Sequence, residues 1–148
     1  MRSKPIVLML AVLVLGGAAC GGGSGGTTVG VELREYEITP NKISAPAGEV
    51  AFDITNAGAF VHEMEVVKTD VSVDQLPSDA NGQFDAAAAS AQVVKSAKNV
   101  AAGATVRLVV RLTAGGYVLV CDRPADATEG TPAHFSRHMY APFVVTKG

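Results

Sequence analysis

The sequence has no tryptophan, few aromatic residues of any kind and only two cysteines in 148 residues. Two cysteines cannot build the disulfide framework of a small secreted scaffold. Neither sign of charge dominates, since 12 basic residues stand against 14 acidic ones, so the clustered positive charge typical of DNA- or RNA-binding proteins is missing. Almost half of the residues are apolar, which excludes a disordered chain, and the length suits a single domain. No nucleic-acid partner is therefore expected.

The first nineteen residues, 1–19, have the three-part layout of a secretory signal. Arg2 and Lys4 supply a positive start, residues 6–15 form an uninterrupted apolar run, and small residues follow up to Ala19. The apolar run is shorter than the roughly 20 residues that span a bilayer. We therefore expect a signal that is removed, with a short retained membrane helix as the alternative.

Cys20 directly follows these small residues and opens a Gly/Ser-rich stretch at 20–27. The residues Gly-Ala-Ala-Cys at 17–20 resemble the lipobox of bacterial lipoproteins, in which the cysteine is acylated and becomes the new N-terminus. Two or three acyl chains on one residue give stable membrane anchoring, where a single chain would be marginal. The resemblance implies lipidation of Cys20, a flexible tether at 20–27 and an extracytoplasmic location at the outer face of the cell membrane.

From residue 28 onward, apolar and polar residues alternate in short runs separated by turn residues. These runs lie at 29–38, 50–55, 62–66, 105–112, 117–121 and 142–146. A one-residue slip before Tyr36 indicates a β-bulge, and Asn-Ala-Gly at 56–58 indicates a turn. Glu63 and Glu65 alternate with apolar residues and are expected on an exposed strand face, solvated rather than catalytic. The pattern predicts an all-β fold, a Greek-key β-sandwich of seven or eight antiparallel strands over 28–148.

The segment at about 70–95 breaks this alternation because it is polar and rich in alanine. Asp85 is a good helix N-cap, and the alanines after it are strong helix formers, so residues 85–90 could form a short helix. We predict a short helical or irregular excursion between two strands and not a second domain.

Cys121 is the one free thiol if Cys20 is acylated, and it ends an alternating run. Without a partner for an internal disulfide, it is an inert core residue, an intermolecular link or a metal ligand. His62 begins an earlier run, while His134 and Met139 lie between Cys121 and the last run. A thiolate, two imidazoles and a weak thioether together form a donor set suited to copper in both of its oxidation states.

A cysteine that ends a strand, then a loop with a histidine and a methionine, then a returning strand resembles the cupredoxins, or blue copper proteins. The other histidine of that family lies far upstream after a turn, where His62 stands. The resemblance covers roughly 29–146. It implies one copper ion, cycling between Cu(I) and Cu(II), with His62, Cys121 and His134 as equatorial ligands and Met139 as the axial ligand.

Twelve residues, 122–133, separate Cys121 from His134, whereas the family usually has two to four. This insertion is rich in Pro, Asp, Thr and Gly, so we expect it to bulge out as a surface loop without moving the ligands. His138 offers a competing imidazole just before Met139, and whether it or Met139 is the fourth ligand stays open.

The resemblance implies an electron-transfer protein and not an enzyme, because catalysis generally needs an open coordination position or a second metal centre and neither is evident. Electrons would pass through the imidazole edge of His134, within an apolar surface patch that could include Phe60, Phe135 and Tyr140. By family analogy the partner is a transiently bound cytochrome or membrane oxidase or reductase, and the protein is expected to be a monomer. Two alternatives are an extracytoplasmic copper-holding or delivery protein and a metal-free β-sandwich interaction module.

Overall fold

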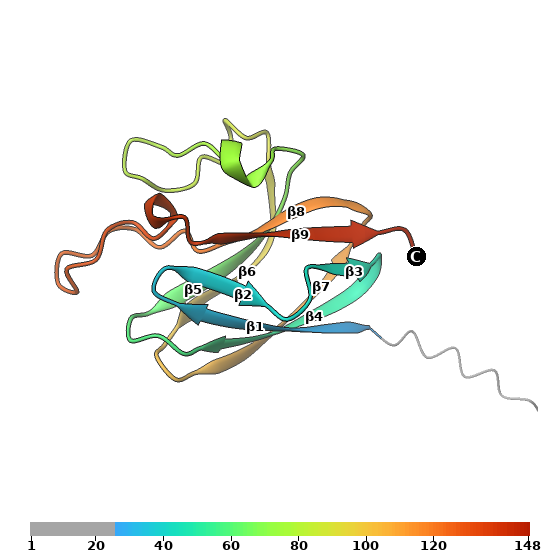
Figure 1. The fold of residues 1–148 in the computed structure, drawn as a ribbon, viewed down its shortest axis with the longest axis horizontal. Helices are drawn as coiled ribbons and strands as arrows, with labels where there is room; N and C mark the ends of the chain where they lie inside the picture. Colours follow the sequence, from blue (N-terminus) through green and yellow to red (C-terminus); the bar gives the residue numbers. More distant parts are fainter. Residues whose placement is uncertain (1–25) are drawn as a thin grey trace, which may run out of the picture.

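The computed structural model describes residues 26–148, in which nine strands form a two-layered sandwich (Figure 1). The strands are β1 Thr27–Arg34, β2 Glu37–Pro40, β3 Ser44–Pro46, β4 Gly48–Asn56, β5 His62–Lys68, β6 Gln92–Val100, β7 Thr105–Leu112, β8 Gly115–Val120 and β9 Tyr140–Thr146. Two short 3₁₀ helices, η1 Val73–Gln75 and η2 Phe135–Arg137, complete the set. Among these residues no helix is both long and apolar enough to cross a membrane. The predicted signal and Cys20 lie outside the described residues.

One sheet has the strand order β2-β1-β4-β7 and the other has the order β3-β9-β8-β5-β6. Most neighbours are antiparallel, but β1 pairs with β4 and β3 pairs with β9 in parallel, because the chain crosses between the layers. The predicted Greek-key β-sandwich is confirmed. The described residues form nine strands where seven or eight were predicted. The alternation did not indicate the three-residue β3 or the longer β6, and it merged β2 with β1 into a single run.

The core lies between the two sheets and is built from the apolar positions of the alternating runs. Val29, Val31 and Leu33 on β1 are all almost fully buried. Phe52 on β4 and Phe143 on β9 meet edge to face across the layers, with ring centroids 5.4 Å apart. Burying a side chain of this size contributes roughly 1.5–3 kcal/mol, so this contact helps to hold the two sheets together.

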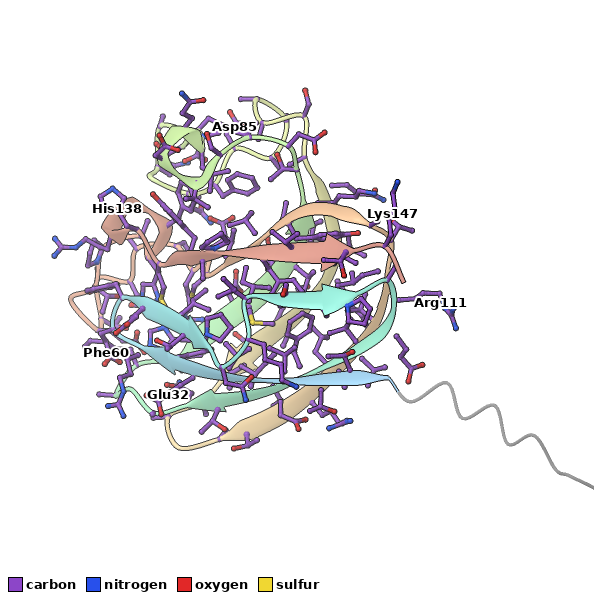
Figure 2. All side chains as sticks on the ribbon, turned by 45° about the vertical axis from the view of Figure 1, so that its right-hand side comes forward. Glu32, Phe60, Asp85, Arg111, His138 and Lys147 are labelled. Carbon is purple, nitrogen blue, oxygen red and sulfur yellow. The ribbon has the colours of Figure 1, made fainter. Side chains whose placement is uncertain are left out.

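The slip before Tyr36 is a hairpin turn and not the bulge that the sequence suggested. Arg34 pairs with Glu37 across antiparallel β1 and β2, so Glu35 and Tyr36 form a two-residue connection. A bulge and a tight turn both shift the alternation, which explains the misinterpretation. The turn between β1 and β2 lies at the end of the sandwich that Phe60 and His138 mark in Figure 2, away from Arg111 and Lys147.

The excursion is an outer layer on the second sheet. Its apolar side chains join those on the outer faces of β5 and β8 in a second core, which contains Val67, Phe84, Ala89, Val118, Val120 and Phe135. The predicted helix at 85–90 is a single turn, in which Asp85 Oδ1 accepts a hydrogen bond from the Ala88 amide at 2.9 Å. The excursion ends at residue 91, because β6 begins at Gln92.

The expectation that Glu63 and Glu65 are solvent-exposed is wrong. Strand β5 is covered on both faces, and these two side chains are 9% and 10% exposed. Lys98 Nζ, from neighbouring β6, donates to Glu63 at 3.1 Å and to Glu65 at 2.6 Å. The alternation shows that Glu63 and Glu65 are polar. It cannot show that a segment further along the chain covers their face of the sheet.

Candidate metal centre

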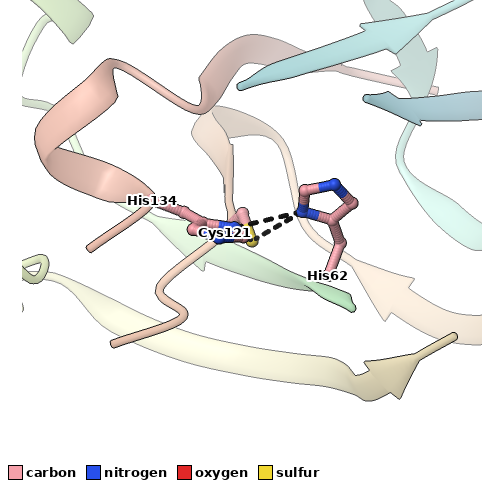
Figure 3. A group of neighbouring side chains, drawn as sticks. All are labelled: His62, Cys121 and His134. Carbon is pink, nitrogen blue, oxygen red and sulfur yellow. Dashed lines mark hydrogen bonds between the residues drawn. The ribbon is translucent and has the colours of Figure 1, made fainter. Parts of the chain in front are cut away.

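Three side chains from separate parts of the chain meet at one end of the sandwich (Figure 3). His62 begins β5, Cys121 directly follows β8, and His134 directly precedes η2. All three are fully buried. Their ligand-type atoms lie within 4.8 Å of one another.

The separations of these atoms suit a shared metal ion. Nδ1 of His62 and Nδ1 of His134 are 3.1 Å apart, and Cys121 Sγ lies 3.4 Å from the His134 nitrogen and 3.9 Å from the His62 nitrogen. Bonds of about 2.0–2.3 Å to one ion require ligand atoms roughly 3–4 Å apart. A thiol and two imidazoles around one point match the donor preference of copper, so the residues fit the ion that the sequence predicts.

The turn before His62 is fixed by Asn56, the last residue of β4. Its Nδ2 donates to the carbonyls of Phe60 and Val100, both at 2.8 Å, and its Oδ1 accepts from the Gly58 amide at 2.9 Å. His62 then pairs with Val100 on β6. The turn predicted at 56–58 is therefore present, and its side-chain bonds set where β5 starts.

Glu35 supports the far side of the His62 ring. Its Oε1 lies 3.3 Å from His62 Nε2 and accepts hydrogen bonds from the amides of Ala59 at 2.6 Å and Phe60 at 2.8 Å. Burial works to raise the pKa of Glu35, but the bonds from Phe60 and the other donors outweigh burial and the pKa is lowered. Sequence reasoning missed this residue, and the phase slip beside it was the one available signal.

Cys121 and His134 stay together because the insertion is closed at its neck. The His134 amide donates to the Arg123 carbonyl at 2.9 Å, so the residues on either side of 124–133 are direct neighbours. Within the insertion, Asp126 and Thr131 exchange two backbone hydrogen bonds of 2.9 and 3.0 Å. A long insertion in the sequence therefore leaves the two candidate ligands adjacent in space.

The backbone of Met139 is hydrogen-bonded to two of the candidate ligands, whereas the His138 side chain lies outside the group. The Cys121 amide donates to the Met139 carbonyl at 3.0 Å, and the Met139 amide donates to the His134 carbonyl at 3.3 Å. The Met139 side chain is fully buried in the core cluster that contains Cys121. His138 is exposed, has a left-handed backbone with φ of 63° and is not among the grouped side chains.

The expectation that the His134 imidazole edge reaches the surface is wrong. The residue is fully buried, and the Tyr36 ring packs against it edge to face at 5.2 Å. Phe135 is also buried and packs between the tilted rings of Phe84 and Tyr140 in the second core, so it cannot line a surface patch around the imidazole. The hairpin turn that the sequence did not reveal supplies Tyr36 and accounts for the difference.

Burial keeps the metal-free group uncharged at neutral pH. It raises the pKa of the Cys121 thiol to about 12, despite the lowering effect of the Glu63 amide, whose nitrogen lies 3.4 Å from Sγ. It also lowers the pKa of His134 to about 4, and repulsion from His62, when that ring is protonated, lowers it further. Metal binding would therefore release the thiol proton.

The excursion braces the ligand segment through Asp122, which the sequence analysis did not single out. The Phe84 amide donates to Asp122 Oδ1 at 2.7 Å, and Gln83 Nε2 donates to the Asp122 carbonyl at 3.0 Å. Burial raises the pKa of Asp122 to about 6. Nothing in the pattern distinguishes Asp122 from the other polar residues of the insertion, because its partners come from the outer layer.

Comparisons with known proteins agree with this architecture. A family model described as a cupredoxin-like domain matches residues 6–131. Reduced auracyanin from the photosynthetic bacterium Roseiflexus castenholzii aligns with a TM-score of 0.54 at 19% identity, over 81% of this chain and 97% of that one. Rusticyanin from Thiobacillus ferrooxidans aligns with a TM-score of 0.54 at 18% identity, over 82% of this chain and 79% of that one.

Auracyanin A, a "blue" copper protein from the green thermophilic photosynthetic bacterium Chloroflexus aurantiacus, aligns with a TM-score of 0.50 at 17% identity, over 82% of this chain and all of that one. At these identities the structural likeness concerns the fold alone. No curated protein sequence matches the chain. The family match ends at residue 131, before His134 and Met139. The placement of these two residues at the site therefore rests on the structure and not on the family match.

Proposed function

The chain belongs to the cupredoxin family, and on that premise we propose that it carries single electrons on one copper ion held by His62, Cys121 and His134. The observation that carries the proposal is the convergence of two imidazole nitrogens and a thiol sulfur in a fully buried group. Met139 is proposed as the weak axial ligand, because its buried side chain belongs to the segment that is tied by its backbone to both Cys121 and His134.

A bound copper ion supplies a one-electron couple, and the protein keeps its ligands still while the charge changes. The ligand side chains come from a stiff sheet and a loop segment tied by backbone hydrogen bonds. Burial of all three side chains keeps water away from them. Such a site favours electron transfer over catalysis, for which an open coordination position is generally needed.

Electrons would cross the protein surface at Tyr36 and not at a bare imidazole. Tyr36 is partly exposed, and its ring centroid lies 5.2 Å from that of His134. The Arg137 guanidinium lies over the Tyr36 ring, 5.4 Å from its centroid. A transient partner needs only a small contact area over this point. By family analogy the partner is a cytochrome or a membrane oxidase or reductase, and the protein acts as a monomer.

We further propose that the protein is a lipoprotein anchored through Cys20 at the outer face of the cell membrane. The signal layout and the Gly/Ser tether at 20–27 support this location. The register of β1 with β4 also supports it, because Thr27 lies beside Val50 while Leu33 lies beside Asn56, at the metal end. The tether thus joins the domain at the end opposite the copper site, which leaves that site free to meet a partner. Mass spectrometry of the mature N-terminus tests the anchor, and an unmodified Cys20 would reject it.

The electron-carrier function is tested by adding Cu(II) to the purified protein and recording its visible spectrum. We expect one equivalent of copper to give an intense thiolate-to-copper band, absent from a Cys121→Ser variant, that bleaches on reduction and returns on reoxidation. A protein that stays colourless and takes up no copper would reject the proposal.

The two alternatives predict different observations. A metal-free interaction module has no reason to bring three buried ligand-type atoms within 4.8 Å of one another, as found here. A copper-delivery protein would give up its ion to a competing chelator or acceptor protein on mixing, whereas an electron carrier retains the ion through repeated redox cycles.

A further inference from the structure

One carboxylate oxygen at the metal end collects three hydrogen-bond donors. Oε1 of Glu35 lies 2.6 Å from the Ala59 amide nitrogen, 2.8 Å from the Phe60 amide nitrogen and 3.3 Å from His62 Nε2. Gly58 leaves the space for it, since a Cβ at that position would collide with the carboxylate. A side chain from the β1–β2 turn therefore holds both the backbone before His62 and the ring itself.

This contact determines which nitrogen of the His62 ring carries the proton. A carboxylate oxygen that receives two amide hydrogens can only accept a third, so Nε2 of His62 donates. Nδ1 is then left with a lone pair, and Nδ1 is the atom that lies 3.1 Å from the His134 nitrogen and 3.9 Å from Cys121 Sγ. The ring is held in the tautomer and orientation that metal binding requires.

The other imidazole has no equivalent support. Nε2 of His134 is buried and has no hydrogen-bond partner in the part of the chain that the structure describes. A carboxylate behind a metal-binding imidazole raises the basicity of the ring and fixes its orientation. The two imidazoles at the proposed copper site are therefore unequal, and Glu35 is the source of the difference.

Building on the proposed function, we infer that Glu35 is a positioning residue that holds His62 ready for the metal and biases the bound ion toward its oxidised form. The bias follows from charge, because a carboxylate close to the ion favours Cu(II) over Cu(I). Glu35→Gln keeps an oxygen acceptor but removes the charge. Glu35→Ala removes both the acceptor and the link to the Ala59 and Phe60 amides.

The first test needs no copper. Nitrogen-15 NMR of the imidazoles in the metal-free protein should show His62 as a single tautomer protonated at Nε2. In Glu35→Ala this tautomer should give way to a mixture, with no comparable change at His134. A wild-type His62 that is already a mixture, or a variant identical to wild type, would overturn the inference. This measurement stays decisive even if the protein binds no copper and the proposed function fails.

The second test uses the copper-loaded protein. Glu35→Gln should raise the reduction potential and weaken Cu(II) binding by about ten- to a hundredfold, the usual range for such outer partners. Glu37→Gln is the matched control, because Glu37 is an exposed carboxylate on the same hairpin that forms no hydrogen bond with the site. The control should match wild type. Equal shifts in both variants, or none in Glu35→Gln, would overturn the inference.

Discussion

His62 enters the metal centre from a strand, whereas His134 enters it from a loop. The position of His62 depends on side chains, since Asn56 fixes the preceding turn and Glu35 holds the ring. The position of His134 depends on backbone bonds, above all the one from its amide to the Arg123 carbonyl. Among the described residues, Nε2 of His134 has no hydrogen-bond partner comparable to the Glu35 carboxylate that holds His62.

This difference has a practical consequence for mutagenesis. Side-chain supports are removed by one substitution, whereas backbone hydrogen bonds survive most substitutions of the residues that form them. The position of His62, and with it copper affinity, should therefore be sensitive to substitutions of residues that do not contact the metal. The position of His134 should tolerate substitutions in the insertion. Copper binding on this side should be lost mainly when a ligand itself is removed.

The largest effect is expected from removing the loop-borne imidazole. His134→Ala should abolish the intense copper band, because it deletes one of three equatorial donors from a buried group. His138→Ala is the control and should keep the band, since this exposed imidazole lies four residues away and outside the group. Visible absorption of both copper-loaded variants decides the matter. A band lost in His138→Ala would mean that the wrong histidine has been assigned.

For the strand that carries His62, Asn56→Ala should destabilise the fold by about 3 kcal/mol, because the buried carbonyl of Val100 and the partly buried carbonyl of Phe60 lose their donor. Copper affinity should fall as well, since the turn before His62 loosens. Urea unfolding of the metal-free protein measures the first effect. Asn81→Ala, an exposed site in the outer layer, should stay within about 0.5 kcal/mol of wild type. An Asn56 variant as stable as this control would contradict the claim that Asn56 fixes the turn before His62.

The buried imidazole should also make stability depend on pH. The unfolded His134 takes up a proton near its ordinary value of 6.5, but the folded residue stays neutral down to a pKa of about 4. Between these values the unfolded state binds more protons, so the contribution of His134 to stability is complete above pH 6.5 and is lost as pH falls to 4.

Other groups titrate in the same window, Asp122 in the opposite direction because burial raises its pKa to about 6. The contribution of His134 is therefore measured as the difference in unfolding free energy between wild type and His134→Ala, both metal-free. As the pH is lowered from 6.5 to 4, wild type should lose more unfolding free energy than His134→Ala does. A difference that stays constant would mean that the imidazole is not buried.

The smallest spectral effect is expected from shortening the insertion. Replacing residues 125–132 by two glycines removes most of the loop but keeps Arg123 and His134, whose backbone bond closes the neck. The copper band should keep its position and intensity. Oxidation of the reduced protein by a small reagent such as ferricyanide should become faster as cover is removed. Loss of the band would show that the insertion itself positions His134.

Much of the fold could be predicted from the sequence because the core-facing sides of the strands are apolar. The alternation found β1, β4, β5, β7, β8 and β9. It could not separate a bulge from a hairpin at Glu35 and Tyr36, since both shift the phase by one residue. It also misplaced Glu63 and Glu65, because burial of that face depends on the excursion and neutralisation depends on Lys98.

The candidate ligands could be predicted from the chemistry of their side chains. The kinds of residue and their order along the chain pointed to His62, Cys121 and His134, which the structure brings together. Their supports were not predictable. The acceptor for the His134 amide lies eleven residues earlier, and Glu35 is 27 residues from His62, and neither pairing has a local pattern.

X-ray absorption at the copper edge of the Cu(II)-loaded protein examines the proposed ligand group most directly. The account predicts one sulfur and two imidazole nitrogens at roughly 2.0–2.3 Å from the ion, with the sulfur contribution missing in Cys121→Ser. An ion surrounded by nitrogen and oxygen alone, or a shell unchanged by the loss of the thiol, would contradict it.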